Sequence, residues 1–137
     1  MSLRPFSLSA SERLKSKKEI ETLFQSGEAF FLFPFKVFYR IQTRNLESSP
    51  ANIGISIPKK IHRNAHQRNR IRRLMKEAYR LNKSVLYGPL NDRLLHMNLM
   101  VIYTHKEEMS YADTEKAVKR LLHKLNEKFN PGKITEE

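Results

Sequence analysis

The residues best suited to bind a ligand form one strongly basic stretch between positions 59 and 80. These 22 residues hold nine lysines and arginines and a single acidic residue, so they carry +8 of the chain's formal charge of +12. With acidic partners nearly absent one helical turn away, the cations repel one another unless an anion binds. Arginines outnumber lysines six to three in the stretch, which favours forked contacts to phosphate. The pattern therefore predicts a polyanionic partner, with nucleic acid as the first candidate.

Residues for protein-based catalysis are not evident. His62 and His66 have a spacing that could hold a metal on one helix, but the surrounding cations oppose metal binding, and we expect both side chains to be solvated or to contact phosphate. We expect Glu107 and Glu108 to be solvated loop charges. The chain has no cysteine, no P-loop and no Gly-x-Gly-x-x-Gly motif. We assign no catalytic residue, and metal binding by the protein is left unassigned.

Two predicted helices place these groups. The basic stretch continues into an amphipathic helix over residues 65–81, whose apolar face is formed by Ile71, Leu74, Met75 and Ala78. A Ser-x-x-Glu capping box predicts an earlier helix over residues 16–25. Gly27 follows that helix, where we expect it to adopt the left-handed conformation of a C-terminal cap.

Alternating side chains predict the strands beside these helices. An aromatic edge strand covers residues 30–33 and ends at Pro34, and residues 35–41 alternate as a half-buried strand. In that strand Phe38 shares a face with Lys36 and Arg40, an arrangement suited to stacking on bases. A further strand over residues 53–57 alternates isoleucines with the small residues Gly54 and Ser56, which leave room for a ligand backbone.

The remaining segments complete one domain of 137 residues. Residues 82–97 are predicted to form a loop with one helical turn, residues 99–103 a strand buried on both faces, and residues from 110 a last helix that stops at the Asn-Pro-Gly of 130–132. The element order is α-β-β-β-α-β-α, with 1–14 and 131–137 as flexible tails. No apolar run is long enough to span a membrane, and no secretory signal or cysteine is present, so we expect a cytoplasmic protein.

The basic stretch also carries a family resemblance. Residues 65–80, AHQRNRIRRLMKEAYR, resemble the RNR motif of the bacterial ribonuclease P protein subunit, whose pattern is Ala-Val-x-Arg-Asn-Arg before a basic amphipathic helix. The strand at 53–57 with Lys59-Lys60 resembles that family's Val-Gly-Leu-Ser-Val-x-Lys-Lys. The similarity covers residues 13–126. The chain departs from the family pattern at a few places. His66 stands where the motif has valine, and Pro58 stands where a small polar residue is common. The loops at 61–64 and 82–98 are longer than in most members of the family.

The resemblance implies an α/β (α+β) two-layer sandwich with a four-stranded sheet. Its β-α-β crossover would be left-handed, against the usual right-handed rule. It also implies a ribonucleoprotein endoribonuclease that removes the 5′ leader of precursor tRNA. The RNA subunit would be the catalyst, with Mg²⁺ held mainly by RNA. The partners would be the ribonuclease P RNA and precursor tRNA, with no membrane or DNA partner and a monomeric protein in the complex.

Carried onto this chain, the resemblance assigns two groups of residues. The RNA-contacting set comprises Lys59, Lys60, Arg63, Arg68, Asn69, Arg70, Arg72, Arg73 and Lys76. The cleft that holds the leader comprises Ile20, Phe24, Lys36 and Phe38. A ribosomal protein or an RNA chaperone would share the charge and the size, and it would not stimulate cleavage of precursor tRNA. A helix-turn-helix DNA-binding protein ranks lower, since a strand and Pro58 occupy the place of its first helix.

Overall fold

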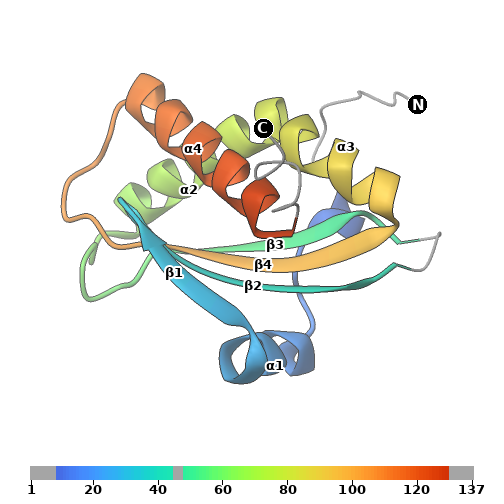
Figure 1. The fold of residues 1–137 in the computed structure, drawn as a ribbon. Coiled ribbons are helices and arrows are strands. Elements are labelled where there is room, and N and C mark those ends of the chain that lie inside the picture. The colour runs from blue at the N-terminus through green and yellow to red at the C-terminus, as the bar shows by residue number, and fades with distance from the viewer. Residues whose placement is uncertain (1–8, 45–47, 130–137) are drawn as a thin grey trace.

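A computed structural model describes residues 9–44 and 48–129, which form one sheet, four α-helices and a short 3₁₀ turn (Figure 1). The elements are η1 (Ala10–Glu12), α1 (Lys17–Ser26), β1 (Glu28–Leu32), β2 (Phe35–Thr43), β3 (Ala51–Ser56), α2 (Ala65–Asn82), α3 (Ser84–Arg93), β4 (Leu95–Tyr103) and α4 (Tyr111–Phe129). No helix in the described ranges is long and apolar enough to cross a membrane.

The sheet has the order β1-β2-β4-β3, with β4 antiparallel to β2 and parallel to β3. Helices α2, α3 and α4 cover one face, and α1 lies against the other (Figure 1). As a central strand between two layers, β4 is buried along most of its length, including Leu99, Met100 and Val101. This confirms the prediction of a strand buried on both faces, although it begins four residues earlier than expected.

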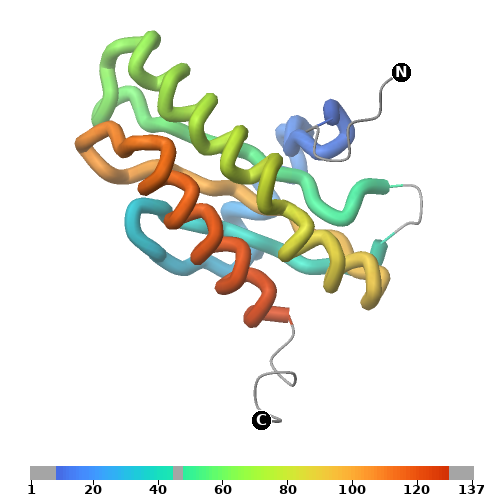
Figure 2. The backbone as a smooth tube through the Cα atoms, turned by 90° about the horizontal axis from the view of Figure 1, so that it is seen from above, coloured from blue at the N-terminus to red at the C-terminus, as the bar shows by residue number. Residues whose placement is uncertain are grey.

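The parallel pair β3 and β4 is joined through α2 and α3 on one side of the sheet. Figure 2 views the molecule from that helical side; when it is turned so that both strands point upward, β4 lies to the left of β3. The crossover is therefore left-handed, as the family resemblance implies, and it departs from the general rule.

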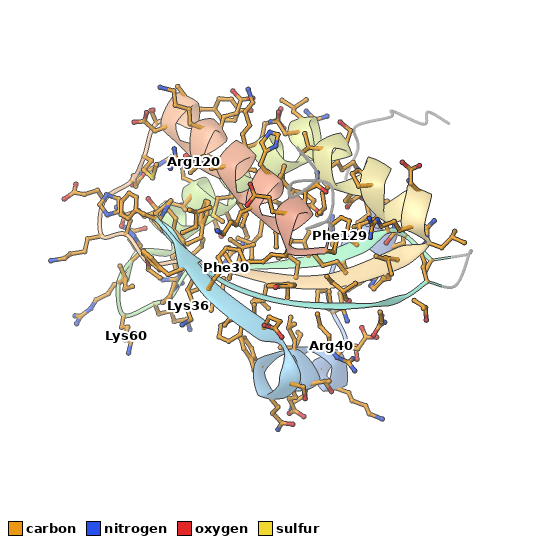
Figure 3. The ribbon with its side chains drawn as sticks, viewed as in Figure 1. Phe30, Lys36, Arg40, Lys60, Arg120 and Phe129 are labelled. Carbon is orange, nitrogen blue, oxygen red and sulfur yellow. The ribbon has the colours of Figure 1, made fainter. Side chains whose placement is uncertain are left out.

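The main core lies between the sheet and α2, α3 and α4. The alternation of β2 turns Phe35, Val37 and Tyr39 into it, while Lys36 and Arg40 stay exposed on the opposite face. This confirms the predicted division of the strand between an apolar face and a basic face with Phe38. Figure 3 shows Arg40 on the α1 side of the sheet and Phe129 on the helical side.

The prediction of a loop with one helical turn at residues 82–97 is wrong. The segment contains α3 and the first residues of β4. Pro89 lies inside α3 and removes one backbone hydrogen bond, but Leu86 and Leu90, one turn apart, are both fully buried in the core. Their burial outweighs the missing bond, because each buried leucine contributes about 1.5–3 kcal/mol.

The predicted flexible tail at 1–14 is also wrong for its last six residues. Glu12 and Leu14 are buried, and the Leu14 N–H donates to the carbonyl of Ile53 at 3.0 Å. We call residues 9–15 the N-terminal arm. Residues 1–8, the tail at 131–137 and the predicted Asn-Pro-Gly stop at 130–132 lie outside the described residues.

Gly27 does end α1, but not in the left-handed conformation that we predicted. Its φ of −77° and ψ of 165° are extended backbone that any residue can adopt. A Cβ at this position would lie 2.5 Å from the carbonyl oxygen of Leu23 and 2.9 Å from that of Tyr39. Small size, and not φ, is therefore what the site requires.

Candidate nucleic-acid interface

The interface begins at the N-terminus of α2, where Asn64 caps the helix. Its Oδ1 accepts hydrogen bonds from the N–H groups of His66 at 2.8 Å and Gln67 at 3.3 Å. Such a cap stabilises a helix by roughly 0.5–2 kcal/mol. It fixes the start of α2, whose bounds confirm the predicted helix over 65–81. The positive end of the helix dipole then lies beside the basic residues that follow.

The apolar face of α2 packs on the core and fixes which side chains remain outside. Ile71, Met75, Ala78 and Tyr79 are buried, while Leu74 is half-buried. Along the outer side lie the residues predicted to contact RNA from this helix: Arg68, Asn69, Arg70, Arg72, Arg73 and Lys76. The three predicted residues of the lead-in loop, Lys59, Lys60 and Arg63, are exposed, and Figure 3 shows Lys60 on this loop.

Arg68 has a structural contact of its own. Its Nη1 donates to the carbonyl oxygens of His62 and Arg63, each at 2.9 Å, and so ties the lead-in loop to α2. Arg72 donates to Oδ1 of Asn69 at 3.0 Å, one turn away on the same helix. These contacts hold part of the basic surface in place before any ligand binds.

Arg70 is paired with a carboxylate that the sequence did not connect to it. Its Nε and Nη2 donate to Oε1 and Oε2 of Glu108, both at 2.8 Å. The Arg70 hydrogen bonds are the largest cause that lowers the pKa of Glu108 to about 2. The prediction that Glu108 is a solvated loop charge is therefore wrong. The pairing was missed because the two residues are far apart along the chain and meet only through the loop after β4.

His62 is not the solvated residue that we predicted. It is 2% exposed, and its Nε2 donates to the carbonyl oxygen of His105 at 2.7 Å. Its ring packs at 5.7 Å from that of Tyr103. His62 thus joins the lead-in loop to the loop after β4, whereas His66 is exposed on α2 as expected.

The four predicted cleft residues come together between α1 and the sheet. The rings of Phe24 and Phe38 meet edge to face, with centroids 4.8 Å apart, and the Lys36 Nζ lies 5.6 Å from the centre of the Phe38 ring. Ile20 and Phe38 also pack on a small second core made by Leu14, Leu23 and Met100. Phe38 is therefore half-buried, while Phe24 is 44% exposed.

Two further features of this face were not anticipated. Phe31 is 58% exposed and pairs with Lys36 across β1 and β2, which extends the aromatic surface. Gly54 is partly covered, since a Cβ there would lie 2.8 Å from the Met100 Cε, but Gly54 and Ser56 still line an open cavity, in agreement with the predicted space for a ligand. The flexible Met100 side chain fills the place of the missing side chain.

Within residues 9–44 and 48–129, no group of three or more histidine, aspartate and glutamate side chains could hold a metal ion. The described part of the chain presents exposed cations along α2 and its lead-in loop, and exposed aromatic rings on the α1 side of the sheet.

Comparison with known proteins decides the family. The family model "Ribonuclease P" matches residues 8–126. The ribonuclease P protein component of Porphyromonas gingivalis is 35% identical over 120 residues, covering 88% of this chain and 87% of that protein. That of Syntrophus aciditrophicus is 31% identical, covering 98% of this chain and 100% of that protein.

The chain belongs to the bacterial ribonuclease P protein component family.

Solved structures support the fold of the family. The ribonuclease P protein of Staphylococcus aureus aligns with a TM-score of 0.63 at 23% identity, over 82% of this chain and 93% of that one. The ribonuclease P protein of Thermotoga maritima aligns with a TM-score of 0.63 at 22% identity, over 81% of this chain and 94% of that one.

As a ribonuclease P protein component, the chain acts in tRNA 5′ maturation, in the endoribonuclease that removes the 5′ leader of precursor tRNA. Family membership also implies that it associates with RNA, and it sets aside the ribosomal-protein and chaperone alternatives.

Proposed function

We propose that the chain contributes to leader removal by binding two RNAs on two faces. Helix α2 and its lead-in loop bind the ribonuclease P RNA, and the cleft beside α1 holds the 5′ leader of precursor tRNA. The protein itself is a monomer in a cytoplasmic complex. The observation that carries the proposal is the position of exposed Arg70 and Arg73 on a helix whose opposite face is locked into the core.

The cleft suits a single strand of RNA. Phe24 and Phe31 are exposed, and Lys36 supplies a cation opposite Phe31 and beside the Phe38 ring. Bases of any sequence can stack on such rings, while the cation attracts the phosphates. Phe38 is half-buried, and its ring packs edge to face against the ring of Phe24 and holds it in position.

Mg²⁺ enters the proposal through the RNA. As the family resemblance implies, the protein's own groups would bind and orient RNA, and metal-assisted hydrolysis would be supplied by the RNA subunit.

The test is reconstitution. The protein is mixed with a ribonuclease P RNA and labelled precursor tRNA at low Mg²⁺, and the mature 5′ end is followed. We expect stimulation by the wild type and a loss with R70A/R73A. The control K116A/K119A removes the same charge from exposed positions of α4. An equal effect of the two double variants would contradict the assignment of α2, and cleavage by protein without RNA would overturn the proposed division of labour.

Affinity for the RNA subunit gives a second measure. Removing one arginine–phosphate interaction should flatten the dependence of log K on log salt by about 0.7–0.9. R70A/R73A should show this change, whereas K116A/K119A should retain the wild-type slope.

A further inference from the structure

A basic groove lies outside the α1 cleft, along the free edge of β3. As the last strand in the sheet order, β3 has one edge without a neighbouring strand. A cavity of about 510 Å³ follows this edge. One wall is formed by residues 13–15 of the N-terminal arm, the other by Arg72 and Lys76 of α2, and the floor by residues 53–57 and Met100.

The charge of this groove is of one sign. Arg13 and Lys15 line one wall and Arg72 and Lys76 the other, and no lining residue is acidic. Four cations held on two separate elements repel one another, and a bound polyanion relieves that repulsion. None of the four takes part in a salt bridge to the described carboxylates. The unpaired positive charge of the lining therefore favours binding of an anion in the groove.

The floor adds hydrogen-bonding groups. The carbonyl of Ile53 points to the open edge, where it accepts from the Leu14 N–H. Because backbone groups alternate sides along a strand, Ile55 turns its N–H and C=O to the same edge. Ser56 lines the same site and carries a hydroxyl. These groups can bind phosphate oxygens and ribose hydroxyls.

A buried network holds the outer wall in position. Glu12 is 6% exposed, and its Oε1 accepts from the Lys83 Nζ and the Tyr87 hydroxyl, both at 2.7 Å. Its Oε2 accepts from the Ser9 N–H at 3.0 Å. The Tyr87 hydroxyl also lies 3.1 Å from that of Tyr79. The arm is therefore anchored to the junction of α2 and α3, immediately before Arg13.

We propose that this groove extends the basic surface of α2 across the edge of β3 to the N-terminal arm, where Arg13 and Lys15 take the phosphates of a single-stranded RNA segment and Glu12 positions the outer wall. The inference deepens the proposed function and rests on it. A volume of about 510 Å³ is that of a pocket for a small ligand and admits one strand rather than a duplex. An acidic peptide fits less well, because β3 ends three residues after its bridge to the arm at Ile53 and offers too short an edge for strand addition.

The first test reverses the charge of the wall. R13E/K15E changes two exposed residues, and K17E/K18E changes two exposed residues of α1 outside the groove by the same amount. For an unstructured RNA oligonucleotide we expect R13E/K15E to lower affinity about tenfold more than K17E/K18E and to flatten the salt dependence by about 0.7 for each phosphate no longer bound. Equal reductions of RNA affinity in the two variants would overturn the assignment of the groove as an RNA-binding site.

The second test acts through Glu12 alone. E12Q makes the protein more positive, so a purely electrostatic attraction predicts tighter RNA binding. A released arm predicts weaker binding, with a flatter salt dependence, and this is the expected result. Tighter or unchanged binding by folded E12Q would overturn the positioning role. If circular dichroism shows that E12Q is unfolded, Y87F takes its place, because it removes one hydrogen bond to Glu12 without changing the charge. Weaker RNA binding by folded Y87F is then the expected result, and unchanged binding would overturn the positioning role.

Titration with separate RNAs shows which RNA the groove binds, and it distinguishes failure of the groove from failure of the proposed function. Ribonuclease P RNA, precursor tRNA and mature tRNA are each titrated with wild type and R13E/K15E. A selective loss with precursor assigns the groove to the leader, and a selective loss with ribonuclease P RNA assigns it to the RNA subunit. If the oligonucleotide reports the groove but reconstitution gives no stimulation, the proposed function fails while the groove stands.

Discussion

At the scale of single residues, the pairing of Arg70 with Glu108 has the clearest consequence for binding. A carboxylate with two oxygens occupies the same donors of the guanidinium that a phosphate would use. RNA must displace Glu108 before it can make a forked contact with Arg70. The carboxylate thus keeps the arginine oriented and lowers its net affinity for phosphate.

Glu108→Gln should therefore increase affinity for the ribonuclease P RNA and steepen its salt dependence, by up to about 0.9 if Arg70 then binds one further phosphate. Glu107→Gln is the matched control, since Glu107 is exposed in the same loop. Filter binding at several salt concentrations measures both. Identical slopes in the two variants would show that Arg70 does not exchange partners.

The same pair predicts a pH dependence. Since its pKa is lowered to about 2, Glu108 stays ionised throughout pH 5–8, and its competition with phosphate is constant there. Its stabilising contribution is present above the ordinary pKa of 4.5 and disappears as the pH falls toward about 2. The ratio of RNA affinities of Glu108→Gln and wild type should therefore be the same at pH 6 and pH 8.

Phe24 and Phe38 differ in burial, and this separates stacking from packing. Phe24→Ala should lower affinity for precursor tRNA by about 1–3 kcal/mol if one base stacks on it, with mature tRNA unaffected and little change in thermal stability. Phe38→Ala should lower both precursor affinity and melting temperature, because Phe38 packs on the second core. Equal losses for precursor and mature tRNA with Phe24→Ala would remove Phe24 from the leader site.

At the scale of elements, α2 combines an apolar inner face with a basic outer face, and its start is fixed by side chains. Asn64 caps the first turn, and Arg68 reaches back to the carbonyls of the lead-in loop. Arg68→Ala would therefore disturb the loop as well as any RNA contact. For this reason Arg70 and Arg73 are the sharper test of binding.

Asn64→Ala should lower the free energy of unfolding by about 1 kcal/mol, whereas Asn64→Asp should keep most of the stability because aspartate also caps helices. Thermal unfolding of the three proteins measures the effect, expected as a shift of about 3–5 °C. If Asn64→Ala melts with the wild type, the cap does not contribute to the stability of α2.

At the scale of the whole molecule, the N-terminal arm is joined to the helical layer by one buried ion pair. Glu12 and Lys83 are far apart along the chain, and their side chains are 8% and 9% exposed. Burial by itself raises the pKa of Glu12, but the hydrogen bonds from Lys83, Ser9 and Tyr87 outweigh it, so the pKa lies below its ordinary value. The carboxylate is therefore charged in the folded protein at neutral pH.

This sign predicts how stability depends on pH. The contribution of Glu12 is fully present above pH 4.5 and is lost as the pH falls below that value. Glu12→Gln should lower the free energy of unfolding by about 3 kcal/mol at pH 7, since it leaves Lys83 buried without its counter-charge, and by less at pH 3.5. Urea unfolding at the two pH values checks this. A constant difference between the variant and wild type would contradict the ion pair.

Much of the fold follows from local patterns in the sequence. The capping box, the alternation of residues 35–41 and the apolar face of the basic helix each depend on residues a few positions apart, and α1, β2 and α2 formed as predicted. The basic surface was also predictable, because charge density along a helix survives folding as a charged face. The aromatic pair of the cleft followed from the family resemblance.

What only the tertiary structure decided depends on residues distant in sequence. Helix α3 was missed because Gly88 and Pro89 suggest a turn, while the burial of Leu86 and Leu90 becomes visible only against the core. Three contacts join separate elements of the fold. They are the ion pair of Arg70 with Glu108, the packing of Met100 beside Gly54, and the ion pair of Lys83 with Glu12. A sequence encodes the partners of such contacts but not their proximity, because proximity comes from packing the helices against both faces of one sheet.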